Sequence, residues 1–479
     1  MSVSKYLDQD YEVLRSQCLR EKKLFCDPHF PAVPESLGFN KLGPNSHKTR
    51  GVEWKRPGDL CQKPQFIIAG ATRADVCQGQ LGDCWLMAAI ADLTLDKKIL
   101  ARVIYPEQNF KDKDKYAGIF HFQLWQYGQW VDVVVDDKIP TIKGKLLFVK
   151  SKEQTEFWSA LLEKAYAKVN GCYENLIGGF ASEANEDFTG GILEWYSLNK
   201  APLNLFNIME KALCRGSLLS TYISASNDEK EHKTAEQLVK RHAYSITAAQ
   251  KVKVIKTDKV VELLRLRNPW GHLEWNGAWS DGSKEWDQVS PEDKAKLHYS
   301  TDDGEFWMTY ADYILRYSRL EICNLTPDTP SDDLICWNTC QFEGSWKIGS
   351  TAGGCLNFPA TFCKNPQYRV KLDIDSQGDN KCSALVALMQ KGARQAKHKG
   401  VKNYAIGFYI YKVPDKYKGK QGVCLGPEDL RRPVAQSEFV HMREVCQRFN
   451  LPLDEYVIIP ATKESNKEAN FLLRVFSEK

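Results

Sequence analysis

The sequence predicts an α+β protein in which a two-lobed core is followed by an all-β sandwich domain. Three observations lead to this fold class: an apolar helical run that begins at Cys84, two β-prone runs between 252 and 264 around a polar turn, and a series of short alternating runs after residue 367. Helical and strand patterns segregated in this way are typical of α+β domains. We expect an N-terminal segment over 1–29, a first lobe over 30–190, a second lobe over 191–322, a linker over 323–335 and the sandwich over 336–479.

The first lobe is predicted to be rich in helix, with one helix beginning near Cys84 and a second over 157–169. A loop containing Gly79 and Gly82 precedes Cys84, an apolar run follows it, and Asp83 is the expected N-cap. A thiol at a helix N-terminus is biased towards the thiolate, which is the nucleophilic form of cysteine. Cys84 is therefore a candidate nucleophile. The alternative is a buried helix cysteine without a catalytic role, which is the more common situation for a free cysteine.

The second lobe is predicted to contain a β-hairpin that brings a base close to its orienting group. Two β-prone runs, 252–254 and 260–264, flank a polar turn. His242 opens the first strand and Asn268 closes the second, and their unequal distances from the turn require a bulge or an offset. An imidazole oriented by an amide oxygen is a suitable base for a thiolate. A single His or Asn most often has a structural role. Only the presence of Cys84, His242 and Asn268 in this order along the chain favours a catalytic role.

The last part of the chain has the pattern of an all-β domain. Residues 324–333 have the Pro, Thr and Asp content of a linker. Five short runs with strand composition follow, and they are most simply arranged as a sandwich. These runs are 368–372, 384–388, 406–411, 456–459 and 471–475.

Composition excludes several classes of protein. A net charge of +4 is mild, so we expect no nucleic-acid partner. The 15 cysteines are odd in number, and the closest pair, Cys336 and Cys340, has no histidine pair that would complete a zinc site. The N-terminus lacks a signal-peptide core, and no apolar run is long enough to span a membrane. We therefore expect reduced thiols and a cytoplasmic protein.

Three motifs closely resemble those of the calpains, which are calcium-activated intracellular cysteine proteases. They are Gln78-Gly79-Gln80-Leu81-Gly82-Asp83-Cys84-Trp85, His242-Ala243-Tyr244-Ser245 and Arg267-Asn268-Pro269-Trp270-Gly271. Further blocks over 156–166, 304–308 and 350–354 extend the resemblance nearly end to end. The resemblance implies a papain-like two-lobed core, a C2-like sandwich, and calcium-activated limited proteolysis of protein substrates.

The resemblance also assigns roles within the site. The catalytic residues are implied to be Cys84, His242 and Asn268, with an acyl-enzyme thioester as intermediate. The side chain of Gln78 and the backbone N–H of Cys84 are the implied oxyanion donors, and one such donor is typically worth roughly 3 kcal/mol of barrier. The implied substrate-binding positions are Gly179, Arg241 and Trp270. Trp270 resembles the tryptophan thought to hold the lobes apart when calcium is absent.

Calcium is the cofactor that the resemblance implies. One site would use the Ile68 and Gly70 carbonyls with Asp75 and Glu156, and a second would use Glu274, Asp281, Asp303 and Glu305 with the Thr301 carbonyl. Carboxylate and carbonyl oxygens are suitable ligands for Ca²⁺. Taken one at a time, however, acidic residues are more often solvent-exposed surface residues than metal ligands. Arg73 and Glu305 resemble the pair that links the two sites.

No EF-hand loop is present, since the nearest candidate, 373–384, ends in Ala384 where Glu is required. We therefore expect a form without the EF-hand domain of classical calpains. Because that domain mediates dimerisation in the family, we also expect a monomer.

One residue departs from the family pattern. Glycine usually precedes the catalytic histidine, whereas this chain has Arg241, which adds bulk and charge and makes a positive φ costly. A weakly active or inactive calpain-like scaffold that binds lipid or protein is therefore one alternative. A transglutaminase-type acyl transferase is another, but it would normally orient its histidine with Asp rather than Asn268. The basic stretch 394–402 offers contacts to an anionic phospholipid surface, or else is a solvated loop.

Overall fold

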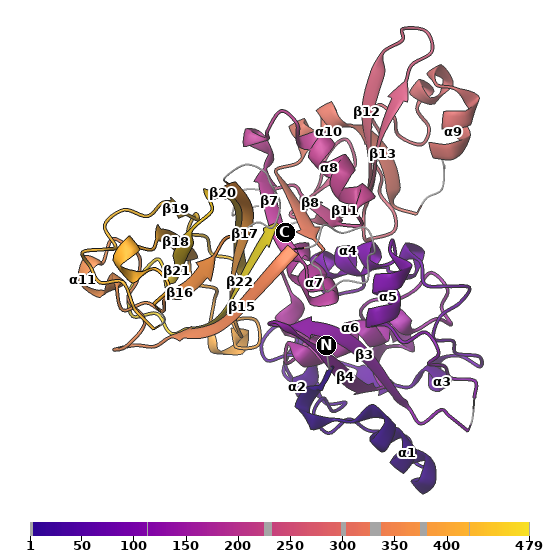
Figure 1. Cartoon of the computed structure of the whole chain (residues 1–479). Helices are drawn as coiled ribbons and strands as arrows, with labels where there is room; N and C mark the ends of the chain where they lie inside the picture. The colour runs from indigo at the N-terminus through magenta and orange to yellow at the C-terminus, as the bar shows by residue number, and fades with distance from the viewer. Residues whose placement is uncertain are drawn as a thin grey trace. The chain divides into compact units, whose positions relative to one another are not determined.

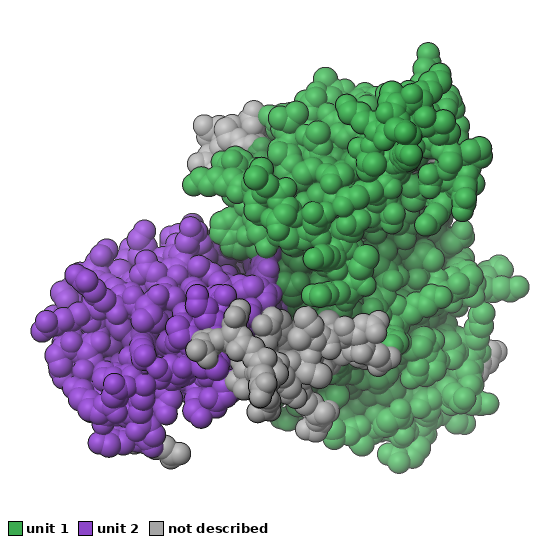
Figure 2. Space-filling model, turned by 45° about the horizontal axis from the view of Figure 1, so that its top comes forward, with its two compact units in different colours: residues 1–191, 195–325, 329–331 green, residues 192–194, 326–328, 332–479 purple. Residues whose placement is uncertain are grey.

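The computed structural model describes residues 3–112, 114–224, 232–297, 303–325, 337–373, 381–420 and 422–478. Thr301 and residues 326–335 of the predicted linker lie outside this set. The chain divides into two compact units, shown in green and purple in Figure 2. Unit 1 contains residues 1–191, 195–325 and 329–331, and unit 2 contains residues 192–194, 326–328 and 332–479. Within the described residues, no helix is both long and apolar enough to cross a membrane.

The first half of unit 1 combines helices with two small sheets (Figure 1). Its helices are α1 (Tyr11–Glu21), α2 (Pro34–Leu37), α3 (Pro57–Leu60), α4 (Cys84–Leu93), α5 (Lys97–Val103), α6 (Trp158–Val169) and α7 (Ala181–Thr189). One sheet has the order β1 (Ser4–Lys5), β4 (Gln129–Asp136) and β3 (Ile119–Gln126). The other has the order β2 (Val52–Lys55), β5 (Ile139–Ile142) and β6 (Lys145–Leu146).

Helix α4 begins at Cys84, as predicted, and every later residue of the helix is buried. The predicted N-cap position of Asp83 is confirmed, but a capping role for its side chain is not. Asp83 occupies the N-cap position, but its side chain makes no capping hydrogen bond and is fully buried beside Glu163 of α6. Burial raises the pKa of Asp83 to about 7, and burial together with the Asp83 charge raises the pKa of Glu163. Two carboxyl groups in one dry site are stable only when they share a proton.

The second half of unit 1 is built on a six-stranded sheet. Its order is β13 (Glu305–Thr309), β12 (Val260–Arg267), β11 (Ala243–Lys253), β8 (Leu218–Tyr222), β14 (Arg319–Asn324) and β7 (Ile192–Ser197). The remaining elements are α8 (Leu205–Cys214), α9 (Pro291–Leu297), α10 (Tyr310–Arg316) and the pair β9 (His232–Lys233) and β10 (Val239–Lys240). Strand β14 continues to Asn324, two residues past the predicted lobe boundary.

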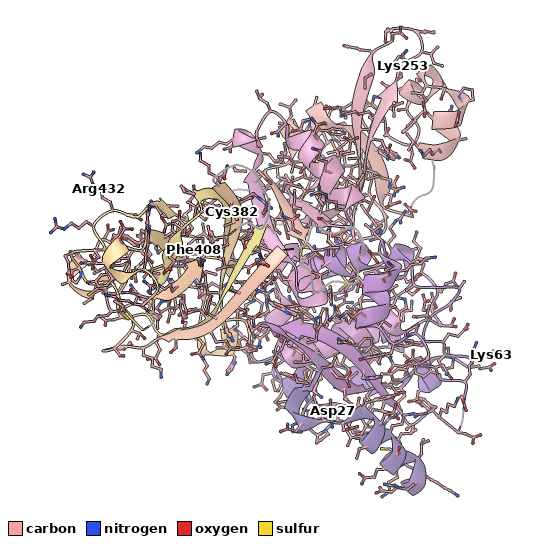
Figure 3. All side chains as sticks on the ribbon, in the orientation of Figure 1. Asp27, Lys63, Lys253, Cys382, Phe408 and Arg432 are labelled. Carbon is pink, nitrogen blue, oxygen red and sulfur yellow. The ribbon has the colours of Figure 1, made fainter. Side chains whose placement is uncertain are left out.

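The predicted hairpin is confirmed as the antiparallel pair β11 and β12, whose tip is marked by Lys253 in Figure 3. The expected irregularity is also present, because the register shifts between Ile246 and Ala248. Strand β11 packs on α4, and the Ser245 hydroxyl donates to the Ala88 carbonyl at 3.0 Å. This contact fixes the start of β11 against the helix that begins with Cys84.

Unit 2 contains two four-stranded sheets around a shared core. One has the order β15 (Trp337–Trp346), β22 (Ala469–Glu478), β17 (Lys381–Gln390) and β20 (Glu444–Pro452). The other has the order β16 (Tyr368–Lys371), β21 (Glu455–Thr462), β18 (Ile406–Lys412) and β19 (Ala435–Gln436), and the short helix is α11 (Pro359–Phe362). Cys382 and Phe408, labelled in Figure 3, are fully buried core residues from the two sheets. All five predicted runs are confirmed as strands, whereas β15, β19 and β20 were missed.

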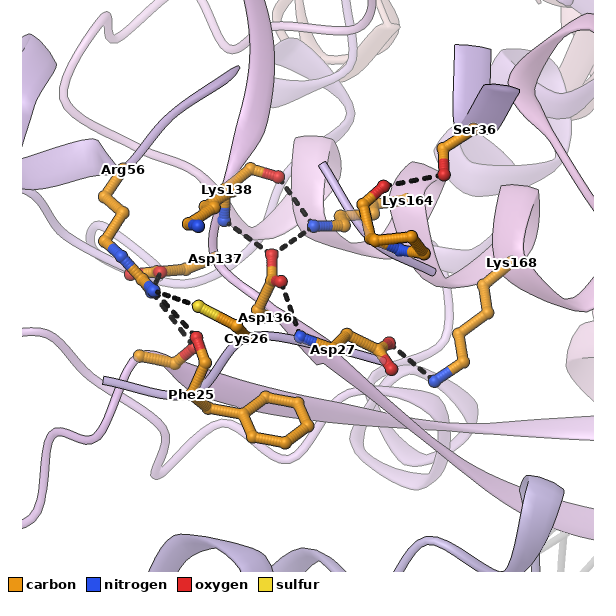
Figure 4. A network of polar contacts seen from close by, with 12 residues as sticks. Phe25, Cys26, Asp27, Ser36, Arg56, Asp136, Asp137, Lys138, Lys164 and Lys168 are labelled. Carbon is orange, nitrogen blue, oxygen red and sulfur yellow. Dashed lines mark hydrogen bonds and ion pairs between the residues drawn. The ribbon is translucent and has the colours of Figure 1, made fainter. Parts of the chain in front are cut away.

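Buried ion pairs attach the N-terminal segment to the rest of unit 1 (Figure 4). Asp27 pairs with Lys168 of α6 at 2.6 Å, and both side chains are at most 1% exposed. The Asp27 backbone N–H donates to Asp136, which pairs with Lys164. Burial lowers the pKa of Lys168, an effect that the Asp27 carboxylate opposes. The predicted segment 1–29 thus supplies a charge that the first half of unit 1 requires.

Substitution of Asp27 by alanine should lower the free energy of unfolding by about 3–5 kcal/mol, because Lys168 would remain buried without its main counter-charge. Guanidinium denaturation of the full chain measures this loss. Lys23→Ala is the matched control: its pair with Glu21 is 76% and 47% exposed, so a change within about 0.5 kcal/mol is expected. A loss below about 1 kcal/mol for Asp27→Ala would contradict the argument.

Candidate active site

The loop before Cys84 is held in place by backbone pairing with residues 147–150. Cys77 and Lys150 exchange N–H···O hydrogen bonds of 2.9 and 3.0 Å, and the Gln80 N–H donates to the Leu147 carbonyl at 2.9 Å. A Cβ added at Gly79 would overlap the backbone of Phe148, so only glycine fits this close approach. The loop therefore delivers Cys84 to the N-terminus of α4 in a fixed position.

Cys84 is a partly exposed free thiol at the first residue of α4. Its neighbour Tyr222, on β8, was not singled out from the sequence. Tyr222 is half-buried, its oxygen accepts a hydrogen bond from the Ala181 N–H, and burial chiefly, with smaller contributions from the charges of Glu321 and Cys84, raises the pKa of its phenol. The nucleophile candidate thus interacts electrostatically with a tyrosine from the second half of unit 1, an interaction that only the fold creates.

His242 and Asn268 meet as the hairpin predicts. They immediately flank β11 and β12, and both are fully buried. His242 Nε2 lies 2.8 Å from Asn268 Oδ1, and because that oxygen only accepts, Nε2 carries the proton. Asn268 is fixed in turn, since its Nδ2 donates to the Leu273 carbonyl at 3.1 Å and its Oδ1 accepts from the Trp270 N–H at 3.0 Å. The imidazole therefore has one tautomer, with Nδ1 as the acceptor.

Gln78 and Trp270 connect the two halves of unit 1. Trp270 Nε1 donates to Gln78 Oε1 at 2.9 Å, and Gln78 Nε2 donates to the Leu81 carbonyl at 2.6 Å. The Gln78 backbone N–H also donates to the Pro269 carbonyl at 3.3 Å. The Trp270 ring centroid lies 4.7 Å from that of His242. Trp270 therefore contacts both the candidate oxyanion donor and the candidate base.

The other two predicted substrate-binding positions lie on loops. Gly179 is half-buried and precedes α7. Arg241 is exposed and has φ 58°, with its N–H donating to the Ile223 carbonyl at 2.8 Å. A non-glycine residue in this left-handed region is strained by about 1–3 kcal/mol. The fold thus requires at Arg241 the conformation that glycine would adopt freely.

Two carboxylates of the first predicted calcium site lie side by side. Asp75 accepts from the N–H and hydroxyl of Thr72 at 2.6 and 3.0 Å, and Glu156 accepts from the Ile68 N–H at 2.6 Å. Burial raises the pKa of Glu156 to about 7, and the Asp75 charge adds to the rise. Gly70, at φ 97°, lies in the same loop as Ile68. Two adjacent carboxylates, one of which is held at a raised pKa by burial and by the charge of the other, fit a hard cation such as Ca²⁺.

The second predicted set is only partly assembled. Burial, with the charges of Asp281 and Asp303, raises the pKa of Glu274 to about 7, and Glu274 and Asp281 line one cavity of about 700 Å³. Glu305 instead pairs with Arg73 at 2.6 Å. Within the described residues, which exclude Thr301, no group of three or more His, Cys, Asp or Glu side chains is arranged to hold a metal ion. The oxygen donors of Glu274 and Asp281 are nevertheless of the kind that suits Ca²⁺.

Comparison with known proteins identifies both parts of the chain. Residues 25–324 match the family model described as calpain family cysteine protease, and residues 342–476 match calpain large subunit, domain III. The chain is 54% identical to the calpain-2 catalytic subunit of Mus musculus over 99% of its length and 69% of that protein. It is 54% identical to the calpain-1 catalytic subunit of Gallus gallus over 99% of its length and 68% of that protein. The resemblance seen in the motifs is confirmed: the chain belongs to the calpain family, whose members are calcium-dependent cysteine endopeptidases.

Proposed function

We propose that the two halves of unit 1 form a papain-like two-lobed core whose catalytic residues are Cys84, His242 and Asn268. His242 Nδ1 takes the proton of the Cys84 thiol, and the resulting thiolate attacks a peptide carbonyl. The C–N bond then breaks, the thioester forms, and the amine leaves with that proton from His242. Water then gives up a proton to His242 and hydrolyses the thioester, which regenerates the thiol. The observation that supports this most is the His242–Asn268 hydrogen bond, which fixes the tautomer with Nδ1 as the proton acceptor.

Gln78 is proposed as the side-chain donor to the oxyanion, beside the Cys84 N–H. An amide side chain has one oxygen and two N–H hydrogens, and the Trp270 indole can only donate, so it must face Oε1. Leu81 takes one N–H of Gln78, which leaves the second for substrate. Trp270 thereby orients the amide that stabilises the transition state.

Calcium is proposed as the activating cofactor. The carboxylates of Asp75 and Glu156, with the Ile68 and Gly70 carbonyls, would hold one ion, and those of Glu274, Asp281, Asp303 and Glu305, with the Thr301 carbonyl, a second. When bound, Ca²⁺ supplies positive charge that offsets the repulsion between these carboxylates. We propose that this favours the arrangement of the lobes in which Cys84 and His242 are aligned. The enzyme would act on cytoplasmic protein substrates as a monomer.

The direct test is cleavage of casein with and without millimolar calcium. We expect cleavage that requires calcium and is lost in Cys84→Ala, because the thiolate is the nucleophile. Gel electrophoresis with an added chelator measures both requirements. Cleavage that persists with chelator would exclude the calcium requirement, and cleavage that persists in Cys84→Ala would exclude the triad.

Substitution of Arg241 tests whether the protein is an active enzyme or a weakly active or inactive scaffold. If its strain and bulk limit turnover, Arg241→Gly should increase kcat/KM for a peptide substrate, chiefly through a lower KM. Arg241→Ala is the matched control, because it removes the bulk and charge but keeps the strained φ of 58°. Of the two variants, glycine should be the more stable to denaturant by up to about 1 kcal/mol. Equal rates in wild type and both variants would show that this position does not limit activity.

We propose further that unit 2 is a C2-like domain that meets anionic lipid. A cavity of about 500 Å³ is lined by Lys399, Lys402, Lys463 and Lys467, and the acid among its lining residues, Glu464, is ion-paired with Lys467 at 2.9 Å. Each basic residue near an anionic surface contributes about 1 kcal/mol.

Sedimentation of the full chain with phosphatidylcholine vesicles should therefore require added phosphatidylserine and weaken with salt. The bound fraction should fall in Lys463→Gln but not in Lys364→Gln, an exposed lysine outside the cavity. Equal binding by both variants would contradict the role of the cavity.

A further inference from the structure

A second cavity in unit 1 adjoins the proposed catalytic residues and has no part in the mechanism above. Its volume is about 480 Å³. Gln78, the proposed oxyanion donor, and Trp270, which orients its amide, form part of its wall. Lysines 145, 150 and 152 form another part. The cavity therefore continues from the oxyanion donor into a basic region.

Backbone pairing fixes two of these lysines. Strands β5 and β6 are joined by Lys143 and Gly144, at φ 51° and 72°, which is the two-residue turn with positive φ that tight hairpins favour. Lys145 follows this turn directly and pairs with Ile142. Lys150 pairs with Cys77, the residue before Gln78. The two ammonium groups thus extend from backbone positions that are set relative to the catalytic loop.

The charge around this cavity is positive. Lys145 and Lys150 are exposed, and neither forms an ion pair with any part of the chain that the structure describes. The carboxylate among the lining residues is Glu156, which is 2% exposed and accepts hydrogen bonds from the Ile68 N–H and the Ser151 hydroxyl. Unpaired cations facing a cavity favour an anionic occupant.

We infer that this cavity binds a carboxylate side chain of the substrate, Asp or Glu, located after the scissile bond. The inference rests on the proposed function, together with the further premise that the backbones of Gly179 and Arg241, two substrate-binding positions that the resemblance implies, hold the residues before that bond. Neither of these residues lines the cavity, whereas Gln78 and Trp270 do. A substrate held at Gly179 and Arg241 therefore reaches the lysines only with residues of its leaving-group side.

The test uses internally quenched peptides that differ only in Glu, Gln or Lys at one of the first three positions after the scissile bond. For the full chain in calcium, kcat/KM for the Glu peptide should exceed that for the Gln peptide by about threefold, the size expected for a partly solvated charge pair. The ratio should fall towards one in high salt and in Lys145→Gln or Lys150→Gln. Because each ratio is taken within one enzyme, differences in active fraction cancel.

Two further variants make the result decisive. Lys143→Gln removes a neighbouring exposed lysine that does not line the cavity, so it should keep the wild-type ratio. Lys150→Glu should reverse the preference towards the Lys peptide, which a misfolded enzyme could not do. A Glu-to-Gln ratio near one in wild type, or an equal ratio in Lys150→Gln and Lys143→Gln, would overturn the inference. Failure to cleave any of the peptides in calcium would instead contradict the proposed function.

Discussion

The pairing of β11 with β12 is the constraint on which the site depends. Residues 242 and 268 are 26 positions apart, and only this hairpin brings His242 within hydrogen-bonding distance of Asn268. The register shift after Ile246 adjusts the strand ends so that the two side chains meet. The same strand carries Ser245, whose hydroxyl bonds to α4, so the base and the helix bearing Cys84 are positioned by one element. Changes in the hairpin register would therefore disturb base, orienting group and nucleophile together.

Unit 1 contains two kinds of carboxylate pair, and their surroundings distinguish them. Asp75 and Glu156 lie beside the loop that contains Ile68 and Thr72, whose N–H groups donate to them, in a setting that suits a cation. Asp83 and Glu163 are fully buried, and their raised pKa values indicate a shared proton. A carboxyl whose pKa is raised by folding contributes stability below its unfolded pKa, and this contribution is lost as pH rises through the folded pKa. The Asp83–Glu163 pair therefore favours folding most in acid, directly beside the nucleophile.

Local patterns predicted much of the fold but few of its long-range contacts. The start of α4 at Cys84 and the hairpin were predictable because glycines, apolar runs and turn residues act within a few positions. Strand β20 was missed because Gln447, Arg448 and Asn450 interrupt its apolar residues and leave no continuous strand-like run. The Trp270–Gln78 hydrogen bond and the position of Tyr222 near Cys84 join residues far apart in sequence, so no local signal marks them. Asp83 is the N-cap residue, but its side chain does not cap α4, because the interaction with its buried partner Glu163 outweighs its intrinsic preference to cap.

Glu156 lines the basic cavity and is also a proposed ligand of the first calcium site, so calcium binding there would link specificity to activation. Without a cation, the paired carboxylates of Asp75 and Glu156 lower the positive potential that Lys145 and Lys150 create. Neutralisation of the pair by a bound divalent ion would leave those lysines as the dominant charges around the cavity. Because Coulomb interactions near a protein surface extend over several ångströms, the attraction for an acidic substrate residue would then increase. The bound ion that would favour the aligned arrangement of the lobes would thus also increase the preference for an acidic substrate residue.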